Sequence, residues 1–277
     1  MNEVKLFVTD LDGSLLRKDH LTVSERNRDA LKALKRRNIP LCACTGRVLC
    51  VLPPAIEELG FDYAITSNGA SCMDLKTGEI IFTAHMPEKT ALYAWDKLEP
   101  THCLTEWYVN GDILMDRHNH AQWESRLKAR WHREYLGQGK GVVVEDIRRD
   151  FLLQGAPGLE KISIFDCPPD IRERAIEPLL ATGEFEIATS LGINFEITHI
   201  SADKGQALQS LCSRLGISVE NAVAFGDASN DKALIATAGI SVAMGNAIDS
   251  LKAAAKDVTL TNEEDGVATF LEEYVLK

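Results

Sequence analysis

Two aspartates separated by a single residue follow an apolar segment near the start of the chain. The stretch reads KLFVTDLDGSLL, in which Asp10 and Asp12 come after a predicted buried strand and directly before Gly13. In an extended backbone their side chains share one side, with Cα atoms about 6 to 7 Å apart. Burying a carboxylate is costly unless a partner stabilises it, so we expect this pair to have a chemical role.

Polar residues also follow other apolar segments that can belong to the same sheet. They come after IPLCAC, after AVAF, and at the start of the helix that precedes AVAF: Thr45, Gly46, Arg47, Lys204, Asp227, Asn230 and Asp231. In open parallel sheets, ligands bind beyond the carboxyl ends of the strands. We therefore expect these residues to lie at one edge of the sheet with Asp10 and Asp12.

The expected site is strongly acidic, because it holds four aspartates against one or two basic side chains, Lys204 and Arg47. Carboxylates this close raise one another's pKa unless a cation intervenes. Magnesium fits, since it takes one or two carboxylates and shares its other positions with water and phosphate. A bound anion would then be held by Thr45, Lys204, Asn230 and backbone N–H groups at Gly13 and Gly46.

Magnesium, a bound anion and a carboxylate at a strand end together predict phosphoryl transfer. One aspartate of the pair can attack phosphorus and form an aspartyl-phosphate. The other can protonate the leaving-group oxygen and later accept a proton from the hydrolytic water. The transition state needs little more than in-line placement and neutralised charge.

Alternating strand and helix signals would position these residues. The predicted strands KLFV, IPLCACT and part of DYAITSNGA alternate with the helices LPPAIEELG and TVSERNRDALKALKRRN, for which Ser24 is the expected N-cap. The alternation resumes with the helix ADKGQALQSLCSRLG, the strand NAVAFGD, the helix NDKALIATAG and the strand ISVAMG. This pattern predicts an α/β fold with a doubly wound parallel sheet.

The middle of the chain has a different pattern. It contains the predicted strands LTEWYV and DILMD, a charged helix near residues 120–135 and a glycine-rich turn, GQGKG, at 137–141. We expect an α/β module over residues 85–187, inserted between core segments 1–84 and 188–277. Trp107, Tyr108 and Met115 favour the core of this module over a substrate-binding surface, and the second role stays open.

Composition and charge exclude several classes of protein. The net charge of −11, without a basic run, argues against non-specific binding to nucleic acid. The N-terminus shows no signal peptide, and no apolar stretch approaches the roughly 18 residues of a membrane span. Seven cysteines without a zinc-type double CxxC fit a reducing compartment. We expect a soluble cytoplasmic protein whose oligomeric state is not predicted.

The motifs DLDGS, TGR, KG and GDASND, in this order, resemble the four motifs of the haloacid dehalogenase superfamily of phosphatases. TSNGA, FEIT ahead of KG, and VAMGNA resemble the Cof-type subgroup. The resemblance covers most of residues 4–84 and 185–270. It implies a Rossmann-like core with an inserted α/β cap that closes over the substrate. Ser14 stands where the family usually has threonine, which keeps the hydroxyl.

The resemblance also implies roles for individual residues. Asp10 would be the nucleophile and a magnesium ligand, and Asp12 the general acid/base with its backbone carbonyl on the metal. Asp227 would be a further metal ligand, and Asp231 would support the metal site. The implied substrate-binding residues are Leu11, Thr45, Gly46, Lys204 and Asn230. The implied activity is the hydrolysis of a small phosphomonoester, a sugar phosphate or a similar metabolite.

Two other functions share parts of this pattern. A phosphomutase would use the same aspartyl-phosphate but return the phosphoryl group to its substrate. A phosphoacceptor signalling domain also gathers acids, threonine and lysine at a sheet edge, but Asp12 and the insert count against it. A calcium-binding EF-hand is excluded, because Leu21 occupies the twelfth position where glutamate is needed.

Overall fold

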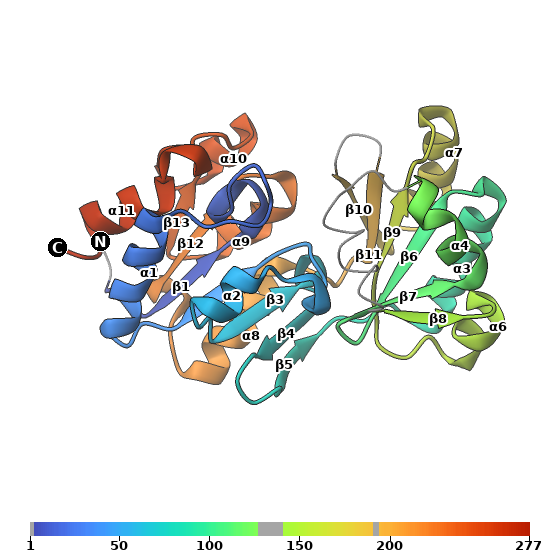
Figure 1. Cartoon of the computed structure of the whole chain (residues 1–277), viewed down its shortest axis with the longest axis horizontal. Helices are drawn as coiled ribbons and strands as arrows, with labels where there is room; N and C mark the ends of the chain where they lie inside the picture. The colour runs from blue at the N-terminus through green and yellow to red at the C-terminus, as the bar shows by residue number, and fades with distance from the viewer. Residues whose placement is uncertain (1–2, 127–140, 191–193) are drawn as a thin grey trace. The chain divides into compact units, whose positions relative to one another are not determined.

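The computed structural model describes residues 3–126, 141–190 and 194–277, which form two compact units (Figure 1). The first unit comprises Met1–Arg47, Leu52–Thr83 and Asp203–Lys277. The second comprises Val48–Val51 and Ala84–Ala202. Within the described part of the chain, no helix combines the length and apolar character needed to cross a bilayer.

The first unit is built on an eight-stranded sheet of order β14-β13-β12-β1-β2-β3-β4-β5. Its strands are β1 (Leu6–Thr9), β2 (Leu41–Cys44), β3 (Tyr63–Thr66), β4 (Ser71–Asp74), β5 (Ile80–Thr83), β12 (Ala222–Gly226), β13 (Ile240–Ala243) and β14 (Asp257–Val258). Strands from β14 to β3 pair in parallel. The predicted parallel sheet is thus confirmed for this part. The antiparallel strands β4 and β5 at its edge were not predicted.

Helices cover both faces of this sheet (Figure 1). Their bounds are α1 (Glu25–Arg36), α2 (Pro54–Glu58), α8 (Lys204–Leu215), α9 (Lys232–Thr237), α10 (Asp249–Ala254) and α11 (Gly266–Tyr274). Phe7 of β1 packs in one core with α1, α2, α10 and α11, whereas Leu6 and Val8 pack in a second core with α8. Because both faces are covered, all four residues of β1 are buried, and only the last of them, Thr9, is polar.

Local capping fixes where the helices begin and end. The Ser24 hydroxyl accepts a hydrogen bond from the Asn27 N–H, as the expected N-cap of α1. Asp203 caps α8 in the same way by accepting from the Gln206 N–H over 2.7 Å, which places Lys204 in the first turn. Gly216 ends α8 in the left-handed conformation that glycine adopts without strain.

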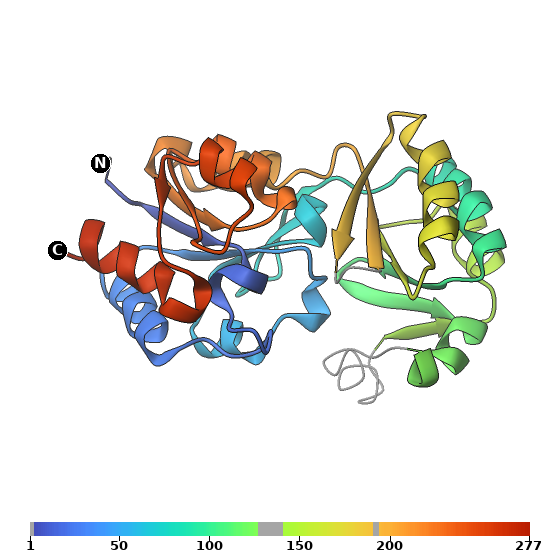
Figure 2. The same cartoon turned by 90° about the horizontal axis from the view of Figure 1, so that it is seen from above.

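The second unit has a six-stranded sheet of order β10-β11-β9-β6-β7-β8. Its strands are β6 (Leu104–Val109), β7 (Asp112–Asp116), β8 (Val142–Val144), β9 (Leu159–Phe165), β10 (Phe185–Ser190) and β11 (Asn194–His199). Its helices are α3 (Glu88–Leu98), α4 (Arg117–Arg126), α6 (Ile147–Asp150) and α7 (Pro169–Leu180). Helices α3 and α7 lie together on one face of this sheet (Figure 2).

The second unit differs from the expected insert in extent. It continues to Ala202 rather than ending at residue 187, because β11 pairs antiparallel with both β9 and β10. Helix α4 begins at Arg117, earlier than the helix expected near 120–135. Residues 127–140, which include most of the GQGKG turn, lie outside the described residues.

The aromatic residues expected in the core of the insert are buried. Trp107 is fully buried among residues of α3, α6 and β9. Tyr108 and Met115 are buried on the opposite side of the sheet, in a smaller cluster with Leu104 and Phe165. This confirms their interpretation as core residues.

Candidate active site

Three strand ends bring the expected polar residues to one edge of the first unit's sheet. Asp10 follows β1, and its N–H donates to the Phe225 carbonyl in β12 over 2.9 Å. Thr45 follows β2, and its N–H donates to the Ile65 carbonyl in β3 over 2.8 Å. Asp227 follows β12 directly. The parallel arrangement therefore brings residues from distant parts of the sequence to the same edge.

Lys204 is the buried cation of this edge. Its Nζ donates to Asp10 Oδ1 over 2.8 Å and to Asp231 Oδ1 over 2.6 Å, and its side chain is fully buried. Burial opposes a charged lysine, but the two carboxylates outweigh it and raise the pKa of Lys204 well above its usual value. Lys204 is therefore charged at neutral pH and holds Asp10 in place.

Asp231 shapes the turn that carries Asp227. Its Oδ2 accepts from the N–H groups of Asp227 and Ala228 over 2.9 and 3.0 Å, and the residue is fully buried. Its other oxygen faces Lys204. One carboxylate thus links the turn after β12 to the first turn of α8.

The turn after Asp10 comes very close to Asp227. Gly13 has a φ of +83°, and a Cβ on it would lie 2.3 Å from Asp227 Oδ2. The neighbouring Ser14 hydroxyl donates to Asp227 Oδ1 over 2.9 Å. Glycine is required here both by the backbone conformation and by the position of the carboxylate.

Asp10, Asp227 and Asp231 offer carboxylate oxygens that all lie within 4.8 Å of one another. Burial, outweighing the nearby Lys204, raises the pKa of Asp10 well above its usual value. Burial and the neighbouring Asp231 raise the pKa of Asp227 to about 7. A cation among these groups would stabilise their charged forms. The donor set, which is all oxygen and mostly carboxylate, fits a hard divalent ion such as magnesium.

The Asp12 carboxylate points to different partners. Arg47 donates to it twice, from Nε to Oδ2 over 2.7 Å and from Nη2 to Oδ1 over 2.6 Å, and His20 Nδ1 lies 2.8 Å from Oδ1. Burial disfavours the charged form of Asp12, but the hydrogen bonds from Arg47 and His20 outweigh it and lower its pKa to about 2. The side chain of Asp12 is thus held apart from the acidic group that fits a metal ion.

A family model described as haloacid dehalogenase-like hydrolase matches residues 7–271. The chain belongs to this family. A 5-amino-6-(5-phospho-D-ribitylamino)uracil phosphatase of Bacillus subtilis is 30% identical, covering 99% of this chain and 97% of the relative. An HMP-PP phosphatase of Shigella boydii is 28% identical over 90% of this chain and 91% of the relative. A solved haloacid dehalogenase-like hydrolase of B. subtilis, 27% identical, matches with a TM-score of 0.82 and covers 98% of this chain and 100% of its own.

Relatives with phosphatase names match this haloacid dehalogenase-like hydrolase along nearly its whole length. They support an enzyme of the phosphoric monoester hydrolase class. The solved structure supports the predicted combination of a Rossmann-like core and an inserted α/β unit. The sequence motifs therefore identified the family correctly.

The expected substrate-binding residues of the hydrolase differ in how they can contact a ligand. Thr45 is buried, and its hydroxyl accepts from the Arg47 N–H over 3.1 Å. Asn230 is half-buried, and its side-chain amide donates to Asn68 Oδ1 over 2.9 Å. The Leu11 side chain is fully buried in the hydrophobic core, so only its backbone can contact a ligand.

Sequence analysis of the hydrolase missed two contributors to the site. His20 lies eight residues after Asp12 in a loop without periodic pattern, and only the structure shows it at the carboxylate. Asn246 donates to the Gly13 carbonyl over 2.8 Å. The VAMGNA motif contains Asn246 and was the one available signal for it.

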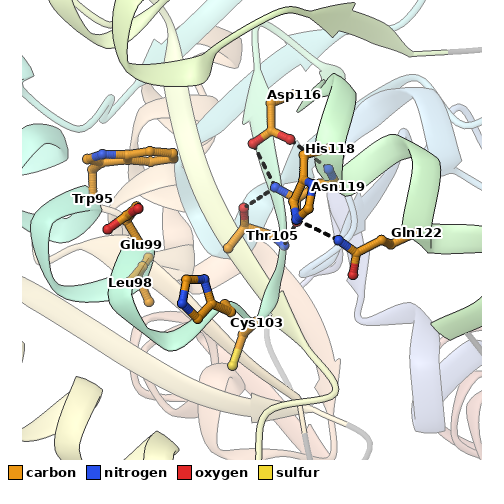
Figure 3. A pocket seen from close by; sticks show the side chains of 10 residues that line it. Trp95, Leu98, Glu99, Cys103, Thr105, Asp116, His118, Asn119 and Gln122 are labelled. Atoms are coloured by element: carbon orange, nitrogen blue, oxygen red, sulfur yellow. Dashed lines mark hydrogen bonds between the residues drawn. The ribbon is translucent and has the colours of Figure 1, made fainter.

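A separate pocket of about 190 Å³ lies in the second unit of the hydrolase, between α3 and α4 (Figure 3). Asn119 Nδ2 donates to Asp116 Oδ2 over 2.7 Å, and His118 Nε2 and Gln122 Nε2 lie 2.6 Å apart. These polar side chains bond to one another rather than pointing together into the pocket (Figure 3). We assign no chemistry to it.

Charged residues are also buried in the sheet of the second unit. Lys161 is almost fully buried, and its Nζ lies 2.9 Å from Glu196 Oε1 and 4.5 Å from the centre of the Tyr108 ring. Burial raises the pKa of the nearby Glu106 to about 8. Sequence analysis did not single out these charged residues, of which only Glu196 in β11 has an apolar neighbour on both sides.

Proposed function

We propose that this hydrolase is a magnesium-dependent phosphatase that hydrolyses a small phosphomonoester, a sugar phosphate or a similar metabolite, through an aspartyl-phosphate. The observation that supports this most is the group of Asp10, Asp227 and Asp231 near Lys204, in which Asp10, Asp231 and the lysine are buried and Asp227 is half-buried. It combines a carboxylate nucleophile, a fixed cation and oxygen ligands for a metal. The B. subtilis and S. boydii relatives are named for small phosphorylated compounds.

Asp10 is the proposed nucleophile. Its Oδ1 is held by Lys204 over 2.8 Å, and its N–H is fixed to β12, so the side chain has a defined position. A carboxylate oxygen of Asp10 would bond to phosphorus while the ester P–O bond breaks. Lys204 would offset the charge of the phosphoryl oxygens, which favours the transition state.

Asp12 is the proposed general acid and base. It would give a proton to the departing oxygen, then take one from the water whose oxygen bonds to phosphorus as the bond to Asp10 breaks. Inorganic phosphate leaves and both carboxylates return to their starting states. The phosphate dianion of a substrate beside Asp12 would favour the protonated form that the first step needs.

Magnesium would be held by Asp10 and Asp227, with Asp231 supporting the site and the Asp12 backbone carbonyl as a further ligand. When bound, the ion would neutralise charge on the phosphoryl oxygens. The phosphoryl group would be bound by Thr45, Gly46, Lys204, Asn230 and the Leu11 backbone. We also propose a cytoplasmic location, because all seven cysteines are free thiols.

Release of inorganic phosphate from p-nitrophenyl phosphate tests this proposal. We expect turnover that requires Mg²⁺, stops on addition of a chelator and is lost in Asp10→Asn. Asp29→Asn is the matched control, because its side chain is 75% exposed on α1, and it should keep full activity. Turnover that survives in Asp10→Asn would contradict the proposal, and return of the phosphoryl group to an organic acceptor would indicate a mutase.

A further inference from the structure

The two oxygens of the Asp12 carboxylate have different surroundings. Oδ1 accepts from Arg47 Nη2 over 2.6 Å and lies 2.8 Å from His20 Nδ1. Oδ2 accepts from Arg47 Nε over 2.7 Å. Each carboxylate oxygen has two acceptor positions in the plane of the group. Within residues 3–126, 141–190 and 194–277, both positions of Oδ1 are therefore occupied, whereas Oδ2 has one left.

His20 must be the donor in its contact with Asp12. An ionised carboxylate only accepts hydrogen bonds, so the proton of this bond lies on Nδ1 of the imidazole. The Asp12 side chain is 34% exposed and that of His20 38%, so the contact lies at the mouth of the site. The Arg47 side chain beneath is 6% exposed.

The loop that carries His20 is itself fixed. The Arg17 N–H donates to the Thr22 carbonyl and the His20 N–H to the Arg17 carbonyl, both over 2.9 Å. Asp19 accepts from the backbone N–H groups of Leu21 and Thr22. The His20 carbonyl accepts from Arg47 Nη2 over 2.7 Å, so this hydrogen bond fixes the loop and the Arg47 guanidinium relative to one another.

We propose that His20 is a positioning residue, whose imidazole saturates Oδ1 of Asp12 together with Arg47 and so makes Oδ2 the oxygen that exchanges the catalytic proton. Oδ2 gives its proton to the leaving oxygen as the ester P–O bond breaks. It then takes a proton from water as the water oxygen bonds to phosphorus. This inference rests on the proposed phosphatase function, in which Asp12 is the acid and base.

The backbone of His20 allows a matched pair of variants. Its φ of +59° is strained for most residues but is readily adopted by glycine and asparagine. His20→Gly removes the donor, whereas His20→Asn keeps an amide N–H near the position of Nδ1. Lys18→Ala, in the same loop, is the control for general effects of substitution there.

The assay compares kcat/KM for p-nitrophenyl phosphate and phenyl phosphate, which differ in how much their leaving groups need protonation. We expect His20→Gly to lower kcat/KM for phenyl phosphate about tenfold more than for p-nitrophenyl phosphate, because general acid catalysis is impaired. His20→Asn should restore the ratio of the two values to within about twofold of the unmodified enzyme. Lys18→Ala should leave both values unchanged.

Equal losses for the two substrates in His20→Gly would overturn the inference, since a purely structural role lowers both alike. Failure of His20→Asn to restore the ratio, with unfolding temperatures of both variants equal, would also overturn it. Asp10→Asn is measured in parallel. Activity in that variant would refute the phosphatase mechanism itself, so the two failures are distinguishable.

Discussion

Replacing Lys204 by methionine should destabilise the protein strongly. Lys204 Nζ lies 2.8 Å from Asp10 and 2.6 Å from Asp231, and the three side chains are 0%, 7% and 0% exposed. Methionine fills a similar volume but leaves two buried carboxylates without their cation. Removing one partner of a buried ion pair costs about 3 to 5 kcal/mol. We expect a loss in the free energy of unfolding of at least about 3 kcal/mol.

Urea unfolding in metal-free buffer measures this loss. Lys35→Met is the matched control, because Lys35 pairs with Asp62 over 2.8 Å but both side chains are 36% exposed. An exposed pair contributes about 0 to 1 kcal/mol, so the control should change little. If Lys204→Met costs no more than Lys35→Met, the electrostatic reasoning about the site is refuted.

Magnesium adds a second arm to the same experiment. A cation bound among Asp10, Asp227 and Asp231 would replace part of the missing positive charge. Ligands that bind only the folded state stabilise it in proportion to the logarithm of their concentration. We expect saturating Mg²⁺ to stabilise Lys204→Met more than the unmodified protein, and an equal effect on both would contradict a shared site.

Two further predictions follow from other positions. Gly13→Ala should lower phosphatase kcat at least tenfold, because its Cβ would lie 2.3 Å from Asp227 Oδ2. Gly78→Ala is the control: its φ of +73° gives similar backbone strain, but no atom lies within 4 Å of the added Cβ, so it should keep activity. Equal activity of the two variants would contradict this prediction. Burial raises the pKa of Glu106 from 4.5 to about 8, so between pH 4.5 and pH 8 the folded state keeps a proton that the unfolded state releases. As the pH rises through this range, the free energy of unfolding should therefore fall by about 5 kcal/mol. Glu106→Gln should remove this component, and unfolding curves with the same pH dependence in both proteins would contradict it.

The parallel part of the core could be predicted because its signals are local. Ser24 marks the start of α1, Gly216 ends α8, and the apolar run of β1 identifies a strand buried on both faces. Strand β4 was missed because its sequence SCMD lacks the apolar run of the central strands, and β5 was missed because its run of three apolar residues, IIF, is short for a strand signal. The extent of the second unit was misjudged because β11 pairs with β9 across the intervening helix α7 and strand β10, a long-range contact that local sequence signals do not show.

Sequence reasoning could predict only those site residues that lie in the four motifs. The edge-of-sheet rule brought Asp10, Asp227 and Lys204 together correctly, because the carboxyl ends of parallel strands meet. The direction of the Asp12 side chain was beyond sequence reasoning, since it depends on a tertiary contact with Arg47 and on the loop conformation that brings His20 to the carboxylate. The burial of the Leu11 side chain likewise depends on packing within the core.

The location of the transferred phosphoryl group tests the central claim most directly. Asp12→Ala should slow hydrolysis of the covalent intermediate, so this variant is mixed with Mg²⁺ and p-nitrophenyl phosphate and quenched in acid. Mass spectrometry of its peptides should find one phosphoryl group on Asp10, which is absent when Mg²⁺ is omitted. A phosphoryl group on any other residue, or phosphate release without a covalent adduct, would contradict the account.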